Sequence, residues 1–307
     1  MKLALELFGT FVKSVASTGH IISDYWLTPA KRLLKSEKLN QLLTQFIKRI
    51  LTIRRTTSDA GVYFFLDQIP LTLQIAEMTI KYYQRTASKE RSDLEHSALR
   101  QIFVNKKYSG TIFKRFLKPV FNISDSDAPE IAVQKILSLK TNCFLREARD
   151  QFKSAVYETA AASSKLTLLV QLSLPEGLPK WLAGNTALPG RLICTLARAL
   201  LSSHNLRVET SRWHKKSPRD QARTTQCRLC DSGIEDIEHM LCACSHFDGP
   251  RHDLVSSLDD SRLSPHESLL SCFFVALSTA DAICCFAFAK FLHKVLSHPV
   301  LCNGSDK

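Results

Sequence analysis

Apolar residues recur at spacings of three and four along most of the chain, which is the period of an amphipathic helix. The clearest stripe lies between residues 37 and 54, and a second lies between residues 71 and 85, after the turn-forming residues 67–70. Further helices are expected at residues 94–103, 132–139, 144–159 and 190–203. No stretch sustains the alternation of a β-strand, so the sequence predicts an all-α fold, a multi-helix bundle.

The most apolar segment, residues 269–289, reads LLSCFFVALSTADAICCFAFA and is nearly long enough to cross a bilayer. Asp281 interrupts it with an acidic side chain, which is costly inside a membrane. We therefore expect a single closing hydrophobic helix that is buried in the protein and not a membrane span.

A stretch rich in proline and glycine at residues 174–189 predicts a division of the chain. We expect a helical region over residues 1–173, a basic and metal-binding domain over residues 190–250, and a C-terminal helical region over residues 251–307. The 307 residues are enough to bury a substantial core.

Four potential metal ligands stand close together near residue 235, in the order Cys-x2-Cys-x8-His-x4-Cys. They are Cys227, Cys230, His239 and Cys244. Two cysteines separated by two residues can face one ion across a tight turn, and zinc prefers tetrahedral coordination by thiolate and imidazole. Four protein ligands leave no open position for a reacting water, so the motif predicts a structural Zn2+ in a small Cys2HisCys module.

Two alternatives remain open for this motif. Cys242 or His246 could replace Cys244 as the fourth ligand after a small change of the helical turn, and the cysteines could instead be ordinary buried residues of a reduced protein. The chain holds ten cysteines, and its first twelve residues include Glu6 without a clean apolar core. We therefore expect a reducing compartment and no secretory signal.

The net charge of +12 is concentrated in two segments. Residues 31–55 hold eight basic residues against one acidic residue, and residues 191–228 hold nine against two, which is +7 in each segment. From residue 231 to residue 262 the sign reverses, with eight acidic residues against two basic ones. The metal motif therefore follows a basic strip and is expected to be acidic on one side.

A basic strip that leads into a metal module suits a polyanion, because each Lys or Arg placed at a phosphate releases counterions. Trp213 could add a stacking face for an unpaired base, which contributes about 1–3 kcal/mol where it occurs. Alternatively the tryptophan packs against the metal site, and the charged runs are solvated helix faces. The candidate nucleic-acid-binding residues are Arg207, Arg212, Trp213, Lys215, Lys216, Arg219 and Arg223.

These residues resemble the C-terminal region of non-LTR (LINE-like) retrotransposon reverse transcriptases. The similarity lies in LRVETSRWHKKSPRDQAR at residues 206–223, followed by CRLC, EDIEH and CSHF, and in the segment at residues 45–85. The first segment resembles the family's lead-in to its terminal zinc-binding domain, and the second resembles the helical region between polymerase and zinc domain. The interval from Arg223 to Cys227 is a little longer than is usual in that family.

The resemblance implies a zinc-stabilised part that handles template RNA or target DNA, and a location in the nucleus or in cytoplasmic ribonucleoprotein. The family's polymerase carries an aromatic-x-Asp-Asp turn that holds magnesium, whereas Asp259-Asp260 here follows Ser257-Leu258. No endonuclease segment is found either. The sequence is thus expected to be a non-enzymatic remnant that begins past the polymerase palm and resembles the thumb and linker over residues 1–173.

Two other functions remain possible from the sequence. In the first, the metal stabilises a structural or protein-interaction module without any nucleic-acid role. In the second, the chain is the product of a decayed reading frame. Other enzyme classes find little support, because no nucleophile elbow, phosphate-binding glycine loop or paired-histidine metal motif occurs.

Overall fold

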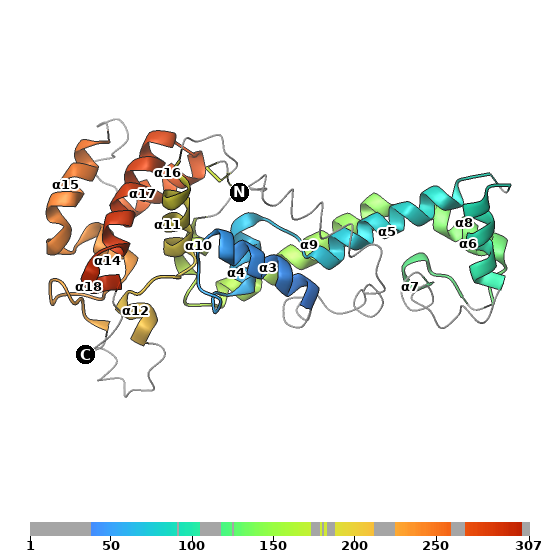
Figure 1. Ribbon diagram of the computed structural model, residues 1–307, viewed down its shortest axis with the longest axis horizontal. Helices are drawn as coiled ribbons and strands as arrows, with labels where there is room; N and C mark the ends of the chain where they lie inside the picture. The colour runs from blue at the N-terminus through green and yellow to red at the C-terminus, as the bar shows by residue number, and fades with distance from the viewer. Residues whose placement is uncertain are drawn as a thin grey trace. The chain divides into compact units, whose positions relative to one another are not determined.

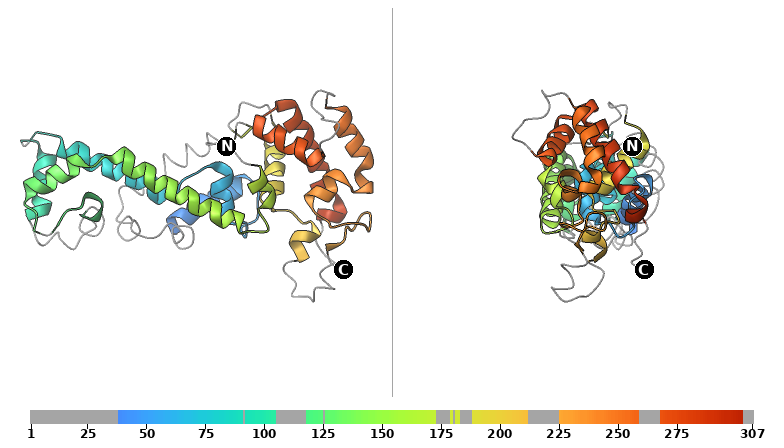
Figure 2. Two further views of the ribbon diagram at one scale, coloured as in Figure 1. Left: turned by 180° about the vertical axis from the view of Figure 1, so that it is seen from behind. Right: turned by 90° about the vertical axis from the view of Figure 1, so that its left-hand side faces the viewer.

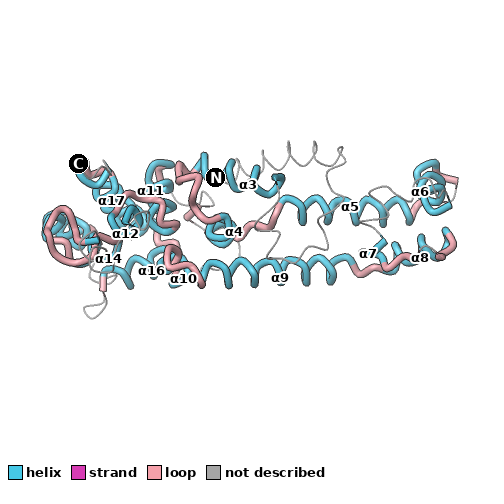
Figure 3. The backbone as a smooth tube through the Cα atoms, turned by 90° about the horizontal axis from the view of Figure 1, so that it is seen from below, coloured by secondary structure: helices cyan, strands magenta, loops and turns pink. Residues whose placement is uncertain are grey.

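The computed structural model describes residues 38–90, 92–104, 118–124, 126–172, 179, 181–182, 188–211, 225–258 and 268–302. Helices account for the regular structure of these residues, and the prediction of an all-α fold is confirmed (Figures 1 and 3). The β-pairing within the described ranges is an isolated antiparallel bridge between Gln226 and Ile234. In the same ranges, no helix combines the length and the apolar character that crossing a membrane requires.

Most of the amphipathic stripes form helices close to their expected positions. Because these stripes are continuous over several turns, the structure differs from the expectation mainly at the helix ends, by a few residues. The helices concerned are α3 (Lys38–Ile50), α5 (Leu71–Ala87), α6 (Leu94–Val104), α8 (Pro129–Ser138), α9 (Thr141–Ala161) and α11 (Gly190–Leu200).

Contacts within the chain divide it into two compact units. The first unit combines Thr44–Gln68 with Tyr157–Lys307, and the second includes Ile69–Val156. The segment Thr44–Gln68 therefore belongs with the C-terminal part of the chain. The boundary expected at residue 173 lies outside the described residues.

The second unit is built around two long helices, α5 and the greater part of α9, which lie side by side (Figures 2 and 3). Arg149 on α9 forms an ion pair with Glu77 on α5, and Thr141 donates a hydrogen bond of 2.6 Å from its hydroxyl to Gln84. Helices α6, α8 and the short α7 (Lys118–Phe121) close one end of this pair around a common apolar core. The core residues are Ile80, Ala87, Leu99, Phe121, Ile123, Ala132, Val133, Ile136 and Leu145.

The first unit contains the metal-ligand motif and the most apolar helices of the chain. Helix α11 packs against α17 (Ala282–Leu296), which also contacts α16 (Leu269–Thr279) and α15 (Asp248–Ser256). Across this interface the Thr195 hydroxyl lies 3.1 Å from Nδ1 of His293, and the buried residues of α11 include Leu192, Leu196 and Leu200. The remaining elements of the unit are α4 (Asp59–Leu66), α10 (Thr167–Gln171), α12 (Arg207–Thr210), α14 (Ile237–Cys242), the 3-10 turn η5 (Ser245–Phe247) and α18 (Pro299–Cys302).

The expectation of one closing hydrophobic helix over residues 269–289 is wrong, because two helices occupy this region. Ala280 adopts a left-handed conformation with φ of 57° and ends α16. Asp281 then caps α17, since its Oδ1 accepts hydrogen bonds from the backbone N–H groups of Ile283 and Cys284 at 2.9 and 3.0 Å. The acidic residue that interrupts the apolar run thus starts a new helix, as side-chain oxygens at N-caps commonly do.

Part of the first basic segment is used inside the protein. The Lys48 side chain is 6% exposed and forms a 2.6 Å ion pair with Asp59. Arg54 donates from its guanidinium to the Asn205 side chain and from its backbone N–H to Ser203 Oγ at 2.7 Å. Basic residues of this segment that lie before Lys38 fall outside the described residues.

Candidate metal centre

A tight turn brings the first two cysteines of the motif together. The backbone N–H of Cys227 donates to the carbonyl of Gly233 at 3.1 Å, and the N–H of Asp231 donates to the carbonyl of Cys227 at 3.0 Å. Asp231 adopts a left-handed conformation with φ of 53°, which aspartate tolerates better than most residues. The chain reverses here and presents the Cys227 and Cys230 side chains toward the same point.

Gly233 makes the close approach of the histidine possible. Its φ is +67°, and a Cβ atom built at this position would lie 2.8 Å from Nδ1 of His239. A residue with a side chain would therefore meet both backbone strain and a steric clash with the imidazole. Glycine allows the turn to pass directly beside the third ligand.

Helix α14 supplies His239, and the fourth ligand, Cys244, follows the end of this helix. Asp236 caps the helix through a 2.7 Å hydrogen bond that its Oδ1 accepts from the backbone N–H of His239. The buried residues of α14 are Ile237, Met240 and Leu241, and they anchor the helix in the first unit. The helix ends at Cys242. The backbone N–H groups of Ala243 and Cys244 both donate to the carbonyl of His239, at 2.9 and 2.8 Å, and this keeps Cys244 close to the histidine.

The four predicted ligands converge on one point. One ligand atom from each of Cys227, Cys230, His239 and Cys244 lies within 4.8 Å of all the others. The Sγ atoms of Cys227 and Cys244 are 3.8 Å apart, and Cys230 Sγ lies 3.2 Å from His239 Nε2. Bond lengths of about 2.3 Å to sulfur and 2.0–2.1 Å to nitrogen give tetrahedral edges of about 3.8 Å and 3.6 Å. The group can therefore hold one metal ion.

The two alternative fourth ligands point elsewhere. Cys242 is not part of the converging group, and it lies near the backbone of Leu270 on α16. The Nε2 atom of His246 lies 3.3 Å from Nε2 of His298, and the two rings meet edge to face. The geometry thus favours Cys244 over both.

The pKa values of the three thiols are shifted in different directions. Burial raises the pKa of Cys227 and raises the pKa of Cys244 to about 12. Burial also acts to raise the pKa of Cys230, but hydrogen bonds involving Ser232 and His239 outweigh it and lower this pKa to about 6. A metal bound here has to displace protons from Cys227 and Cys244, because cysteine coordinates as the thiolate.

A buried ion pair between Arg228 and Glu235 stabilises the turn that carries the first two cysteines. Glu235 is 0% exposed, and both of its carboxylate oxygens accept hydrogen bonds from Arg228, one of them from Nη2 at 2.6 Å. The same guanidinium donates to the backbone carbonyls of Asn205 and Val300, at 2.9 and 3.1 Å. These contacts connect the turn to α18 and to the residues that precede α12.

The sequence did not indicate this role for Glu235 and Arg228. From the sequence, Glu235 is one of the acidic residues expected on one side of the module, whereas its side chain is buried in the structure. Arg228 stands between the two turn cysteines, and the sequence predicts for it only a contribution to the basic charge. A charged residue gives no periodic signal of its own burial, so only the three-dimensional contacts identify the pair.

The described residues include one of the predicted nucleic-acid-binding positions, Arg207. Its guanidinium donates to the carbonyl of Gln226 at 3.1 Å, and its backbone N–H donates to Glu235 Oε1 at 2.8 Å. Arg207 therefore contacts the metal-binding turn directly. The other six positions, Arg212, Trp213, Lys215, Lys216, Arg219 and Arg223, lie outside the described residues.

No protein-family model, curated protein or solved structure matches the chain. The candidate site therefore rests on its own geometry and on the sequence.

Proposed function

We propose that Cys227, Cys230, His239 and Cys244 hold a structural Zn2+, and that the module binds RNA or DNA through the basic segment that precedes it. Three thiolates and one imidazole at tetrahedral spacing suit zinc, which needs neither a redox partner nor a fixed ligand field. The proposed role is binding, as in the terminal region of the non-LTR retrotransposon reverse transcriptases that the sequence resembles. No reaction is assigned to the site.

The observation that carries this proposal is that the metal-binding turn holds both ends of the basic segment. Val208 donates from its backbone N–H to the carbonyl of Glu235 at 3.2 Å, and Glu235 donates from its own N–H to the carbonyl of Thr225 at 2.7 Å. Arg207 joins the two ends directly through its hydrogen bond to Gln226. The basic segment therefore begins and ends beside the metal ligands, at residues 207–211 and 225–227.

The segment between these ends has the composition that single-stranded nucleic acid requires. Residues 212–224 hold five basic residues, one acidic residue and Trp213. Lysine and arginine neutralise phosphates, and an indole ring can stack on a base of any identity. Fixing both ends of such a segment reduces the entropy that it loses when it engages a ligand.

The experiment compares RNA and DNA binding with zinc content on the full chain. Fluorescence polarisation with a labelled 20-nucleotide single-stranded RNA, and with DNA of the same sequence, is measured from 50 to 300 mM salt. The test variant is Lys215→Gln/Lys216→Gln, and Cys227→Ser removes one metal ligand. The matched control is Lys140→Gln/Arg146→Gln, because both of these basic residues are exposed and lie in the other unit.

We expect one equivalent of zinc in the wild type and binding that weakens steeply with salt. Loss of two phosphate contacts should reduce the slope of log K against log salt by about 1.4 for a single strand, and the control pair should leave it unchanged. Cys227→Ser should lose both zinc and binding. Zinc without nucleic-acid binding would refute the nucleic-acid role and favour a structural or protein-interaction module, and absence of zinc would refute the metal assignment.

A further inference from the structure

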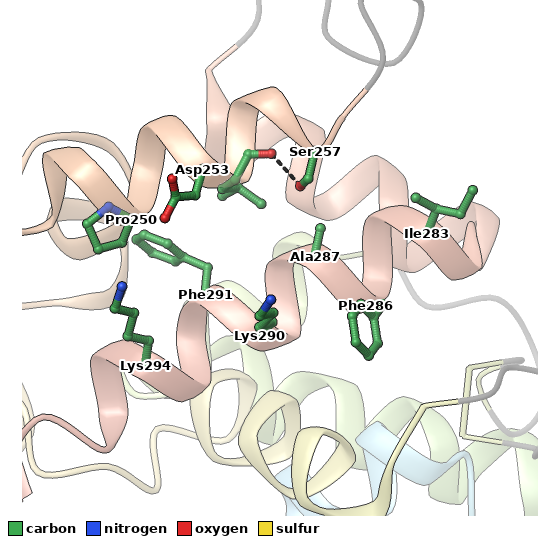
Figure 4. A pocket seen from close by; sticks show the side chains of 10 residues that line it. Pro250, Asp253, Ser257, Ile283, Phe286, Ala287, Lys290, Phe291 and Lys294 are labelled. Atoms are coloured by element: carbon green, nitrogen blue, oxygen red, sulfur yellow. Dashed lines mark hydrogen bonds between the residues drawn. The ribbon is translucent and has the colours of Figure 1, made fainter.

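An apolar groove of about 220 Å3 lies between α15 and α17, away from the metal ligands (Figure 4). Pro250 and Asp253 line it from α15, and Ala287 and Phe291 line it from α17. Leu254 and Phe291 are 3% and 4% exposed, so they form a fixed apolar floor. The groove is a feature of two packed helices and not of a loop.

Two large apolar side chains extend the groove along α17. Ile283 is 56% exposed and Phe286 is 43% exposed, and both line the cavity. From Ile283 to Lys294 the helix rises about 17 Å, which corresponds to roughly three helical turns. Exposed apolar side chains that continue a groove are typical of a surface that another element covers.

The rim of the groove on α17 is positively charged. Lys290 and Lys294 are exposed, stand one turn apart and line the cavity. Neither ammonium group forms an ion pair with a carboxylate of the described residues. Asp253 stands on the α15 side, so the two rims differ in charge (Figure 4).

Size and charge decide between classes of occupant. Small-molecule sites usually enclose about 300–1,000 Å3, so this cavity holds one or two side chains better than a whole ligand. A nucleic-acid strand would bring phosphates toward Asp253 and would leave the apolar floor without a partner. An amphipathic helix places apolar side chains at spacings of three and four into such a groove and can carry acidic residues on one flank only.

We propose that the α15–α17 groove is a docking site for an acidic amphipathic helix of a partner protein. The apolar face of that helix fills the floor over Leu254 and Phe291 and covers Ile283 and Phe286. Its acidic flank faces Lys290 and Lys294. This proposal does not depend on the nucleic-acid role of the metal module, because the groove residues and the basic segment are separate.

The test uses a displayed library of 16-residue peptides with leucine or phenylalanine at four positions of one helical face and randomised flanks. The library is selected on the full wild-type chain and counter-selected on Ile283→Ser/Phe286→Ser, which alters two exposed residues and keeps the buried floor. Selected peptides should carry Asp or Glu on one flank at least fivefold more often than Lys or Arg. Absence of selective peptides, or flanks without acidic enrichment, would overturn the proposal.

The best peptide is then measured by fluorescence polarisation on purified variants. We expect micromolar binding, at least tenfold weaker on Ile283→Ser/Phe286→Ser and on Lys290→Glu/Lys294→Glu. The controls are Val275→Ser, since Val275 is a 52% exposed residue of α16 that does not line the groove, and Lys140→Glu/Arg146→Glu. Exchanging the peptide's acidic residues for lysine should restore binding to the charge-reversed variant.

A loss of single-stranded RNA binding in the Lys290→Glu/Lys294→Glu variant, without any effect on peptide binding, would overturn the proposal and identify the lysines as phosphate contacts. Unchanged RNA binding in this variant would support a separate role for the groove. Failure of the metal module to bind nucleic acid leaves the peptide measurement unaffected, so the two proposals fail independently.

Discussion

The substitution Gly233→Ala tests the geometry of the metal centre with a single methyl group. Gly233 has a φ of +67°, and a left-handed conformation costs a residue with a side chain about 1–2 kcal/mol. The added Cβ would also lie 2.8 Å from Nδ1 and 3.0 Å from Cε1 of His239, where ordinary contacts begin at 3.4 Å. Relief of this clash requires the ring or the turn to move by about half an ångström.

Metal bonds tolerate much less displacement than that, since ligand distances stay within about 0.2 Å of their usual values. We therefore expect a total cost of about 2–3 kcal/mol, which lowers the metal affinity by about 30- to 150-fold at 1.4 kcal/mol for each factor of ten. The strain that the added methyl group causes lowers the metal affinity because binding of the metal and closure of the turn occur together.

The assay is competition for Zn2+ with a chromophoric chelator, together with thermal unfolding. Gly190→Ala is the matched control, because Gly190 begins α11 and a Cβ there would meet nothing within 4 Å. This control should retain wild-type affinity and gain up to about 1 kcal/mol of stability from the better helix propensity of alanine. A Gly233→Ala protein that binds zinc within threefold of wild type would refute the reasoning.

Three further predictions concern the ligand set, the buried ion pair and the second unit. Cys242→Ser should retain one equivalent of metal by elemental analysis and Cys244→Ser should lose it; the reverse result would show that the fourth ligand is wrongly assigned. Glu235→Ala leaves the Arg228 guanidinium, which is 12% exposed, without its buried partner, and should lower the free energy of unfolding by about 3–5 kcal/mol in urea titrations; a loss below 1 kcal/mol would contradict this. Partial burial acts to raise the pKa of Glu77, but its two basic partners lower it below the usual 4.5, so the stability that it contributes is present above pH 4.5 and is lost as the pH falls through the lower folded-state pKa. The difference in unfolding free energy between wild type and Glu77→Gln should accordingly shrink between pH 5 and 3, and a difference that does not change with pH would exclude this mechanism.

The helices that the sequence predicted are those with a continuous apolar stripe, such as α3 and α5. Helix α4 was not expected, because its sequence DAGVYFFL is apolar on nearly all sides and most of its residues are buried. A short segment of this kind has no periodicity that separates a helix from a strand. The prediction of one helix over residues 269–289 is wrong for a different reason. In the sequence, an N-cap aspartate inside an apolar run cannot be distinguished from a buried acidic residue, and only the left-handed conformation of Ala280 shows that one helix ends and another begins here.

The ligands of the candidate site were predictable because metal chemistry restricts both residue type and spacing. The residues that hold these ligands in place could not be predicted in the same way. Glu235 and Asp236 are neighbours of the same charge, yet one is buried against Arg228 and the other caps α14. The difference depends on contacts with Asn205 and Val300, which are remote in the sequence.

The candidate metal module contains few buried apolar side chains. Between Thr225 and Phe247 the buried apolar side chains besides the cysteines are Ile237, Met240, Leu241 and Phe247. Four side chains remove little apolar surface from water for a segment of this length, so the hydrophobic effect alone stabilises it weakly. Because the binding free energy of a structural zinc is folding free energy, in the proposed function the ion supplies a large part of the stability of this turn.

In the proposed function, the same dependence couples the metal to the basic segment. Arg207 and Thr225 contact the metal-binding turn through Gln226 and Glu235, so loss of the ion should release both ends of residues 212–224 at once. Coupling between two ligands of one protein is reciprocal. If zinc strengthens nucleic-acid binding by a given factor, bound nucleic acid must strengthen zinc binding by the same factor, and chelator competition in the presence and absence of RNA measures that factor directly.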